Sequence, residues 1–295
     1  MTEQTASFKP TLSLLDSTMI VAGSMIGSGI FIVSADITRN VGSAGWLIMV
    51  WLITGFMTLT AAMSYGELSA MFPKAGGQYV YLKEAFNPLA GFLYGWSFFA
   101  VIQTATIAAV GVAFSKFIAY LVPELGNNYH LFTVLGLKIH SGQLLAIAII
   151  ILLTAINSRG IKEGKFIQTL FTSAKLLALF GLILFGFVLA KESFWSSNIA
   201  SGFNAQQDLG VDAKGVVPTS WTAIGGTALL GAIAASMTGS IFSSDAWNNV
   251  TFIAGEIKNP KRNIGLSLFL GTLIVTVIYV CTNLMYLNVL PLNEI

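Results

Sequence analysis

The chain has 295 residues, of which 55% are hydrophobic and only 9% are charged, with a formal net charge of +2. Soluble domains carry about 25% charged residues, so this composition excludes a soluble enzyme and a nucleic-acid-binding protein. It predicts an all-α polytopic membrane protein that is embedded in the lipid bilayer. We expect no enzymatic activity, no metal and no cofactor.

Seven segments are long and apolar enough to cross a membrane, since a helical span needs about 20 apolar residues. They lie at about 12–36, 45–72, 88–122, 141–157, 165–190, 220–256 and 263–290. Two longer connections remain, 123–140 and 191–219. We expect His130 and His140 to be solvated in the first connection. The second should be a solvated loop that holds Asp208, Asp212, Lys214 and Pro218.

The distribution of basic residues predicts the orientation in the membrane. One side would carry Lys9, Lys74, Lys83, Arg159, Lys162, Lys165, Lys258, Lys261 and Arg262. The other side would carry only Arg39, Lys138, Lys191 and Lys214. Because cytoplasmic loops are enriched in Lys and Arg, we expect a multi-pass protein of the cell (inner or plasma) membrane with a cytoplasmic N-terminus.

The first apolar segment contains a predicted break at Gly23-Ser-Met-Ile-Gly-Ser-Gly-Ile-Phe31. Its glycines and serines disfavour a continuous helix, and backbone groups freed at membrane depth must find partners. If the chain unwinds at Ile26–Gly29, the free carbonyls near Met25 suit an ammonium and the N–H groups that follow suit a carboxylate. A zwitterionic amino acid offers both charges. Close helix packing through small residues is the alternative interpretation.

The sixth apolar segment is interrupted by Ser243-Ser-Asp-Ala-Trp-Asn-Asn249. A carboxylate at the bilayer centre costs roughly 2.5–3.5 kcal/mol on insertion scales, so Asp245 is a candidate functional residue. Its roles would be to meet a substrate ammonium, to pair with a protein cation or to carry a proton. Alternatively, Asp245 caps the half-helix that follows the break.

Lys175 is the other charge deep inside a span. Such a lysine is paired or lines a polar cavity. We expect its ammonium to bond the carbonyls freed at the first break, or to take the place of a bound sodium ion. The alternative is a side chain that only reaches the membrane interface.

Two broken spans in corresponding positions of two halves indicate a transporter's binding site. The breaks lie in the first and the sixth span, an odd offset that inverts the second half. We therefore predict a single transmembrane domain over 1–295, with a first repeat at about 12–190 and the start of a second, incomplete repeat at about 220–290. A complete second repeat needs five spans, so we expect this chain to be a piece of a longer transporter.

Four motifs stand in a fixed order along the chain. They are Gly27-Ser-Gly-Ile-Phe31, Gly76-Gly-Gln-Tyr-Val-Tyr-Leu-Lys-Glu-Ala-Phe86, Thr172-Ser-Ala-Lys-Leu-Leu-Ala178 and Trp247-Asn-Asn-Val-Thr-Phe-Ile-Ala-Gly-Glu-Ile-Lys-Asn-Pro260. In order and spacing they resemble the L-type amino-acid transporters of the amino acid–polyamine–organocation superfamily. The resemblance runs from about residue 11 to residue 290.

The resemblance implies a LeuT-like fold of 5+5 inverted repeats, of which the first seven helices are present, working by alternating access. It implies that the substrate carboxylate binds the backbone around Ser28 and Gly29, and the amino group the carbonyls of Met25 and Phe242. The implied substrate site comprises Met25, Ile26, Gly27, Ser28, Gly29, Ile30, Phe242, Ser243 and Asp245. Gating and coupling are expected from Lys175, Phe242 and Trp247, and the lysine implies sodium-independent exchange of neutral L-amino acids.

The sequence departs from the family at the second break. Many relatives have Gly-Gly-Trp or Asp-Gly-Trp where this chain has Asp245-Ala-Trp247, and Ser244 stands where an aromatic residue is common. Animal members are tied to a heavy chain through a cysteine in the loop after the third span. The loop 123–140 holds no cysteine, so we expect no covalent heavy chain.

Three functions other than exchange stay open at this point. A proton-coupled amino-acid or polyamine symporter would use a carboxylate such as Asp245. A truncated fragment or amino-acid sensor would bind without transporting. A seven-helix photoreceptor would want a lysine in its last span, and residues 263–290 contain none.

Overall fold

The computed structural model describes residues 10–126, 130–134, 137–158, 161–211 and 218–295. This part of the chain is helical apart from two small antiparallel hairpins. By length and composition, five of its helices could cross a membrane, or up to six if the bent pair α1 (Leu14–Met25) and α2 (Gly29–Val41) forms one span. The fourth predicted span, 141–157, corresponds to a shorter apolar helix, α7 (Ser141–Asn157). The prediction of an all-α polytopic membrane protein is confirmed.

The chain forms two compact units, each held together by its own contacts. The first comprises Met1–Gly77 and Gln168–Ile295, and the second Gln78–Ile167. Helix α8 (Ile161–Val188) starts in the second unit and continues into the first.

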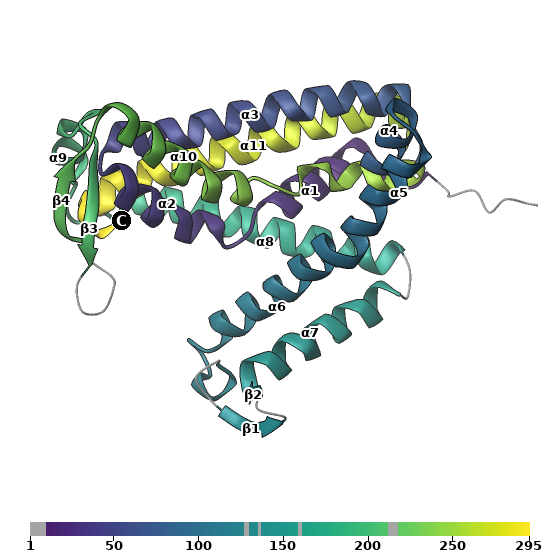
Figure 1. Ribbon diagram of the computed structural model, residues 1–295, viewed down its shortest axis with the longest axis horizontal. Helices are drawn as coiled ribbons and strands as arrows, with labels where there is room; N and C mark the ends of the chain where they lie inside the picture. Colours follow the sequence, from purple (N-terminus) through teal and green to yellow (C-terminus); the bar gives the residue numbers. More distant parts are fainter. Residues whose placement is uncertain (1–9, 127–129, 135–136, 159–160, 212–217) are drawn as a thin grey trace, which may run out of the picture. The chain divides into compact units, whose positions relative to one another are not determined.

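The first unit is built around two long helices, α3 (Ala44–Met71) and α11 (Pro260–Val289), which lie side by side over their length (Figure 1). Helix α1 packs on α11, and helix α10 (Gly226–Ser243) packs on α2 and α3. The 3₁₀ helix η3 (Trp247–Glu256) follows α10, and η4 (Leu292–Glu294) follows α11. Both predicted broken spans therefore lie against the same helix pair.

Small residues allow α3 and α11 to approach closely. A Cβ atom added at Gly66 would lie 3.1 Å from the Cα atom of Gly265, which is tighter than ordinary van der Waals contact. Between helices in lipid, where no hydrophobic force drives association, such close backbone packing is a main source of stability.

The second unit contains one long apolar span in three parts. These parts are α5 (Pro88–Ser97), the π-helical turn η1 (Phe98–Gln103) and α6 (Thr104–Ile118). Asn87 caps this span by accepting a hydrogen bond from the Ala90 N–H at 2.9 Å, and Pro88 occupies the first helical position, where no N–H partner is needed. The remaining elements are α4 (Gln78–Ala85), η2 (Pro123–Leu125), β1 (His130–Val134), β2 (Leu137–His140) and α7.

The two predicted loops are more ordered than expected. The described part of 123–140 contains the paired strands β1 and β2, and that of 191–219 contains α9 (Trp195–Ala200) and the strand β3 (Gln206–Val211). The partner strand β4 (Pro218–Ala223) holds Pro218, which was expected in the loop, and residues 220–223, which were expected to start the sixth span; that span instead begins at Gly226. Trp221 and its neighbours suit a strand as well as a span, because aromatic and β-branched residues favour strands. Asp208 lies opposite Trp221 in this hairpin, whereas Asp212 and Lys214 lie outside the described residues.

Asn198 on α9 shows why the solvated-loop prediction fails. Its side chain is only 4% exposed and donates hydrogen bonds to the carbonyls of Leu287 and Leu290, both at 2.8 Å. Its Oδ1 atom accepts the Leu292 N–H at 2.9 Å. These bonds satisfy carbonyls that the end of α11 would otherwise leave without partners.

Candidate functional site

The first predicted break is confirmed. Helix α1 ends at Met25, helix α2 begins at Gly29, and their axes are bent by 46°. Ile26 ends α1 with an extended backbone (φ −71°, ψ 108°), although its own N–H still donates to the Ala22 carbonyl. The break leaves a positive helix end at α2 and a negative helix end at α1 within one span.

The start of α2 presents free N–H groups. Ser28 is its N-cap residue but makes no side-chain cap hydrogen bond, and the Phe31 N–H donates to the Ser28 carbonyl at 3.1 Å. No described residue accepts a hydrogen bond from the N–H of Gly29 or of Ile30. Free N–H groups at a helix N-terminus bind anions such as carboxylates.

The end of α1 is held by Lys175. Its Nζ atom donates to the Ile26 carbonyl at 2.8 Å and to the Gly23 carbonyl at 3.2 Å. The predicted bond between this ammonium and the freed carbonyls is confirmed, although part of the Lys175 side chain is exposed. The packing alternative is also partly right, because Gly23 lies against Thr172 and Gln168 of α8.

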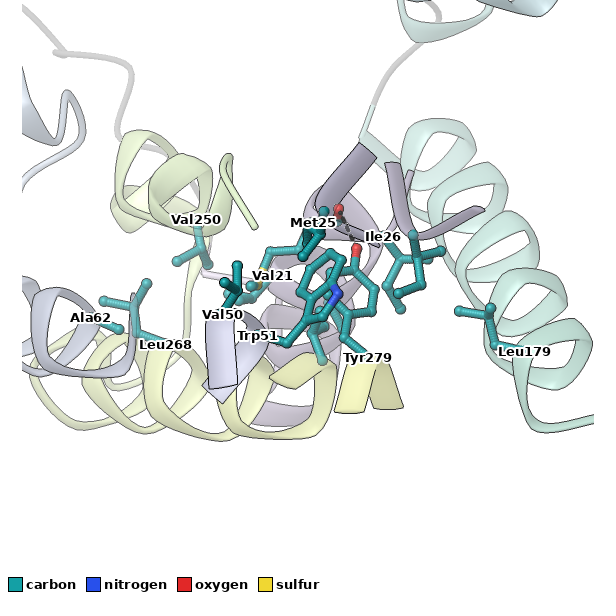
Figure 2. Close-up of a cluster of buried hydrophobic side chains, with 14 of the residues drawn as sticks. Val21, Met25, Ile26, Val50, Trp51, Ala62, Leu179, Val250, Leu268 and Tyr279 are labelled. Carbon is teal, nitrogen blue, oxygen red and sulfur yellow. Dashed lines mark hydrogen bonds between the residues drawn. The ribbon is translucent and has the colours of Figure 1, made fainter. Parts of the chain in front are cut away.

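Tyr279 of α11 joins the two breaks, and sequence reasoning missed it. Its hydroxyl lies 3.1 Å from the carbonyl oxygen of Met25, at the end of α1, and 3.1 Å from that of Ser243, at the end of α10. The ring is 2% exposed and packs edge-on against Trp51, with ring centroids 5.1 Å apart. Figure 2 shows the bond to Met25 and the neighbouring indole. The available signal was a tyrosine in an apolar span, whose hydroxyl needs a partner when buried.

The second predicted break is also confirmed, but the role of one residue in it is corrected. Helix α10 ends at Ser243 and η3 begins at Trp247. Asp245 does not cap η3, since the N-cap residue is Ala246, which adopts a left-handed conformation (φ 65°) and makes no side-chain cap bond. Asp245 is exposed and, within the described ranges, forms no ion pair.

The two residues expected to gate have different surroundings. The Phe242 side chain is 73% exposed. Trp247 packs edge-on against Tyr65 of α3, with ring centroids 5.0 Å apart. The Phe242 carbonyl accepts the Asp245 N–H at 3.3 Å. The Ser244 N–H also points to the Phe242 carbonyl. Since a carbonyl oxygen has two lone pairs, the Met25 carbonyl keeps capacity for a donor besides Tyr279.

The fold brings the two breaks into contact. A Cβ atom added at Gly29 would lie 2.7 Å from the Ser243 Cβ, so the start of α2 touches the end of α10. A Cβ added at Gly27 would meet no atom within 4 Å. The N–H groups of α2 and the carbonyl ends of α1 and α10 thus converge beside open space at Gly27, an arrangement that offers both charges of a zwitterion a partner.

We expect Tyr279→Phe to raise the KM for substrate by about 3- to 10-fold, because it removes a bond of about 1 kcal/mol that fixes both carbonyl ends. The ring and its contact with Trp51 remain, so thermal stability should change little. Tyr286→Phe on the same helix is the matched control. Initial rates at several substrate concentrations separate KM from turnover, and an unchanged KM for Tyr279→Phe would contradict the positioning role.

Comparisons with known proteins identify a family and several relatives. A family model described as amino acid permease matches residues 12–295. The b(0,+)-type amino acid transporter 1 of Oryctolagus cuniculus is 29% identical over 292 residues, which cover 99% of this chain and 54% of the relative. The large neutral amino acids transporter small subunit 2 of Homo sapiens is 31% identical over 98% of this chain and 49% of the relative.

The Asc-type amino acid transporter 1 of Mus musculus is 29% identical over 289 residues. The chain spans about half the length of these curated relatives. The predicted resemblance to L-type amino-acid transporters is confirmed. The matched family model covers both breaks, Lys175 and Tyr279, and the chain belongs to the amino acid permease family.

Proposed function

We propose that the chain forms part of a secondary transporter that exchanges neutral L-amino acids across the cell membrane by alternating access, independently of sodium. The observation that carries the proposal is the meeting of two broken spans, where free N–H groups of α2 face the carbonyl ends of α1 and α10. The names of the relatives, which are amino-acid transporters, support the same substrate class.

The substrate pose follows from the charges at the junction. The carboxylate binds the N–H groups around Ser28, Gly29 and Ile30, where the helix dipole favours a negative charge. The ammonium binds the carbonyl oxygens of Met25 and Phe242, which lie at negative helix ends. Ile26 and Ser243 belong to the two helix ends, Gly27 borders open space, and the Phe242 side chain, which is 73% exposed, closes over the substrate.

Lys175 supplies the fixed positive charge of the mechanism. A bound sodium ion could hold the same carbonyls, but its occupancy would then depend on the sodium gradient. Because the ammonium of Lys175 is covalently part of α8 and bonds Gly23 and Ile26 directly, the site is assembled without a dissociable ion. This supports exchange over sodium-driven uptake.

The proposal extends to the domain organisation, the orientation in the membrane and the partner subunit. The domain is a single transmembrane one whose two repeats start near 12 and 220, with a cytoplasmic N-terminus. One relative is named a small subunit. The only cysteine of this chain is Cys281 on α11, so the loop 123–140 offers no thiol for a disulfide to a heavy chain.

Uptake into proteoliposomes tests the proposal on the full-length protein. Labelled neutral amino acid should enter vesicles preloaded with unlabelled amino acid, not empty ones, and replacing sodium with choline should have no effect. N-acetylated and amidated analogues should not compete, because each lacks one charge. Sodium-driven uptake into empty vesicles would overturn the exchange mechanism, and absence of uptake in every condition would favour a sensor or a non-transporting fragment.

Proton-coupled symport is the second candidate, favoured by the exposed Asp245, which has no cationic partner in the described part of the chain. If exchange is right, Asp245→Asn should keep counterflow and raise KM by about 3- to 10-fold, since the carboxylate only adds attraction for the ammonium. A pH gradient should then drive no accumulation with either protein. Accumulation that is driven by pH and lost in Asp245→Asn would establish symport instead.

A further inference from the structure

The two histidines of the chain lie opposite each other on one hairpin. The sequence contains only His130 and His140, and the antiparallel pairing of β1 and β2 makes them direct cross-strand partners. Side chains of such partners are close enough to interact. Neither residue has a role in the transport site, which lies in the other compact unit.

The geometry of the rings fits a shared ligand. The ring centroids are 5.8 Å apart and the ring planes are inclined by 78°. An imidazole nitrogen binds Zn²⁺ at about 2.0–2.1 Å, and its ring centre lies about 1 Å further from the ion, so two rings on one tetrahedral ion have centres about 5 to 6 Å apart. The observed separation therefore needs little adjustment to accept a metal ion.

Local bonds hold both histidines in place. The Nε2 atom of His130 is hydrogen-bonded to the Thr133 hydroxyl at 3.0 Å, which leaves Nδ1 for another partner. A metal-binding histidine commonly uses its second nitrogen in this way, because the bond fixes the ring and its tautomer. The His140 backbone N–H donates to Gln143 Oε1 at 3.1 Å, and the adjacent Ser141 hydroxyl donates to the Gly126 carbonyl at 2.8 Å.

We propose that His130 and His140 form a binding site for a divalent transition-metal ion of the zinc, nickel or copper class. Imidazole suits these ions and not magnesium or calcium, which prefer oxygen ligands. No group of three His, Cys, Asp or Glu residues that could hold a metal occurs in the described ranges. Two protein ligands and water therefore complete the coordination, and the site stays open and exchangeable.

Metal binding would act on the connection between two helices. The β1–β2 hairpin leads from α6 through η2 into α7, and β2 ends where α7 begins (Figure 1). An ion held by both strands closes the hairpin and fixes the N-terminus of α7, so bound metal stabilises the second unit. Ions that bind only the folded state raise its free energy of unfolding by RT ln(1 + L/Kd), where L is the free ion concentration.

Calorimetric titration of the untagged full-length protein with ZnCl₂ and NiCl₂ tests the site. We expect one ion per chain, with a dissociation constant on the order of 10 μM, much weaker than a closed structural zinc site. His130→Ala and His140→Ala should each weaken binding at least tenfold. Lys138→Ala, which changes an exposed charge on the same hairpin, should leave it unchanged, and MgCl₂ should give no heat of binding.

Electron paramagnetic resonance with CuCl₂ provides a second readout, in which the bound copper should show coupling to imidazole nitrogens that the double histidine variant lacks. Binding that survives in the double variant would overturn the proposal. So would one ion per two chains, since that ratio indicates a site between copies, or no binding at millimolar metal. None of these outcomes depends on transport activity.

Discussion

Replacing Lys175 with alanine should reduce the turnover of the proposed exchange by about 10- to 100-fold while the protein remains folded. The ammonium makes two hydrogen bonds to backbone carbonyls at the end of α1, and bonds from a charged donor contribute about 1.5–3 kcal/mol each. Without them the carbonyls of Gly23 and Ile26 lose their partner, and the broken end of α1 loses its fixed position. Counterflow rates in proteoliposomes, normalised to the amount of folded protein, measure the effect.

Two further variants separate the charge from the side-chain bulk. Lys175→Met keeps the aliphatic stem but not the donor, so it should be as inactive as the alanine variant. Lys116→Ala removes an exposed lysine from the last turn of α6 and should transport normally. A normal turnover of Lys175→Ala would leave the lysine with only an interfacial role, and a strong sodium requirement appearing in that variant would support the replacement of an ion by the ammonium.

Gly29→Ala should lower transport by more than tenfold, whereas Gly27→Ala should fold with unchanged stability. The added methyl at residue 29 would overlap the Ser243 side chain, with the two Cβ atoms only 2.7 Å apart. Overpacking of this kind costs about 1–3 kcal/mol, and here it separates the two breaks that form the site. At Gly27 a methyl meets no atom within 4 Å. Thermal unfolding in detergent and counterflow rates compare the two variants.

A second substitution provides the decisive control. Ser243→Gly removes the side chain that the new methyl would strike, and the nearest remaining atom, the Ser243 Cα, lies 3.3 Å away. The double variant should therefore recover stability and part of the transport lost in Gly29→Ala. If Ser243→Gly gives no recovery, the contact between α2 and α10 is not the reason for the defect.

Sequence reasoning located the breaks because their causes are local. Glycine and serine weaken a helix wherever they cluster. A lone lysine in an apolar span must find acceptors, and the carbonyls freed at the first break are the acceptors that the sequence offers to Lys175. The inverted repeat is different: it rests on the family resemblance and on the two break positions, and it remains a prediction.

The missed features depend on contacts that local sequence does not encode. The hydrogen bond from Tyr279 to Met25 joins residues 254 positions apart, so only the packing of α11 against α1 reveals it. The residue type of Ala246 does not predict its positive φ. Ala246 is the N-cap residue of η3, so Asp245 lies one residue before the capping position. The sequence predicts the start of a span where strand β4 lies, because the aromatic and β-branched residues of β4 are apolar enough for either element.

The Tyr279 hydroxyl carries one hydrogen but faces two carbonyl oxygens at the same distance of 3.1 Å. If α1 and α10 shift relative to each other, the hydrogen can turn from one acceptor to the other, and the donor is never left without a partner inside the bilayer. A buried donor without an acceptor costs about 1–3 kcal/mol of free energy, and this cost does not arise while the two helices move between the two arrangements. The hydroxyl therefore holds the ends of α1 and α10 at α11 in either arrangement, donating its hydrogen to one carbonyl at a time.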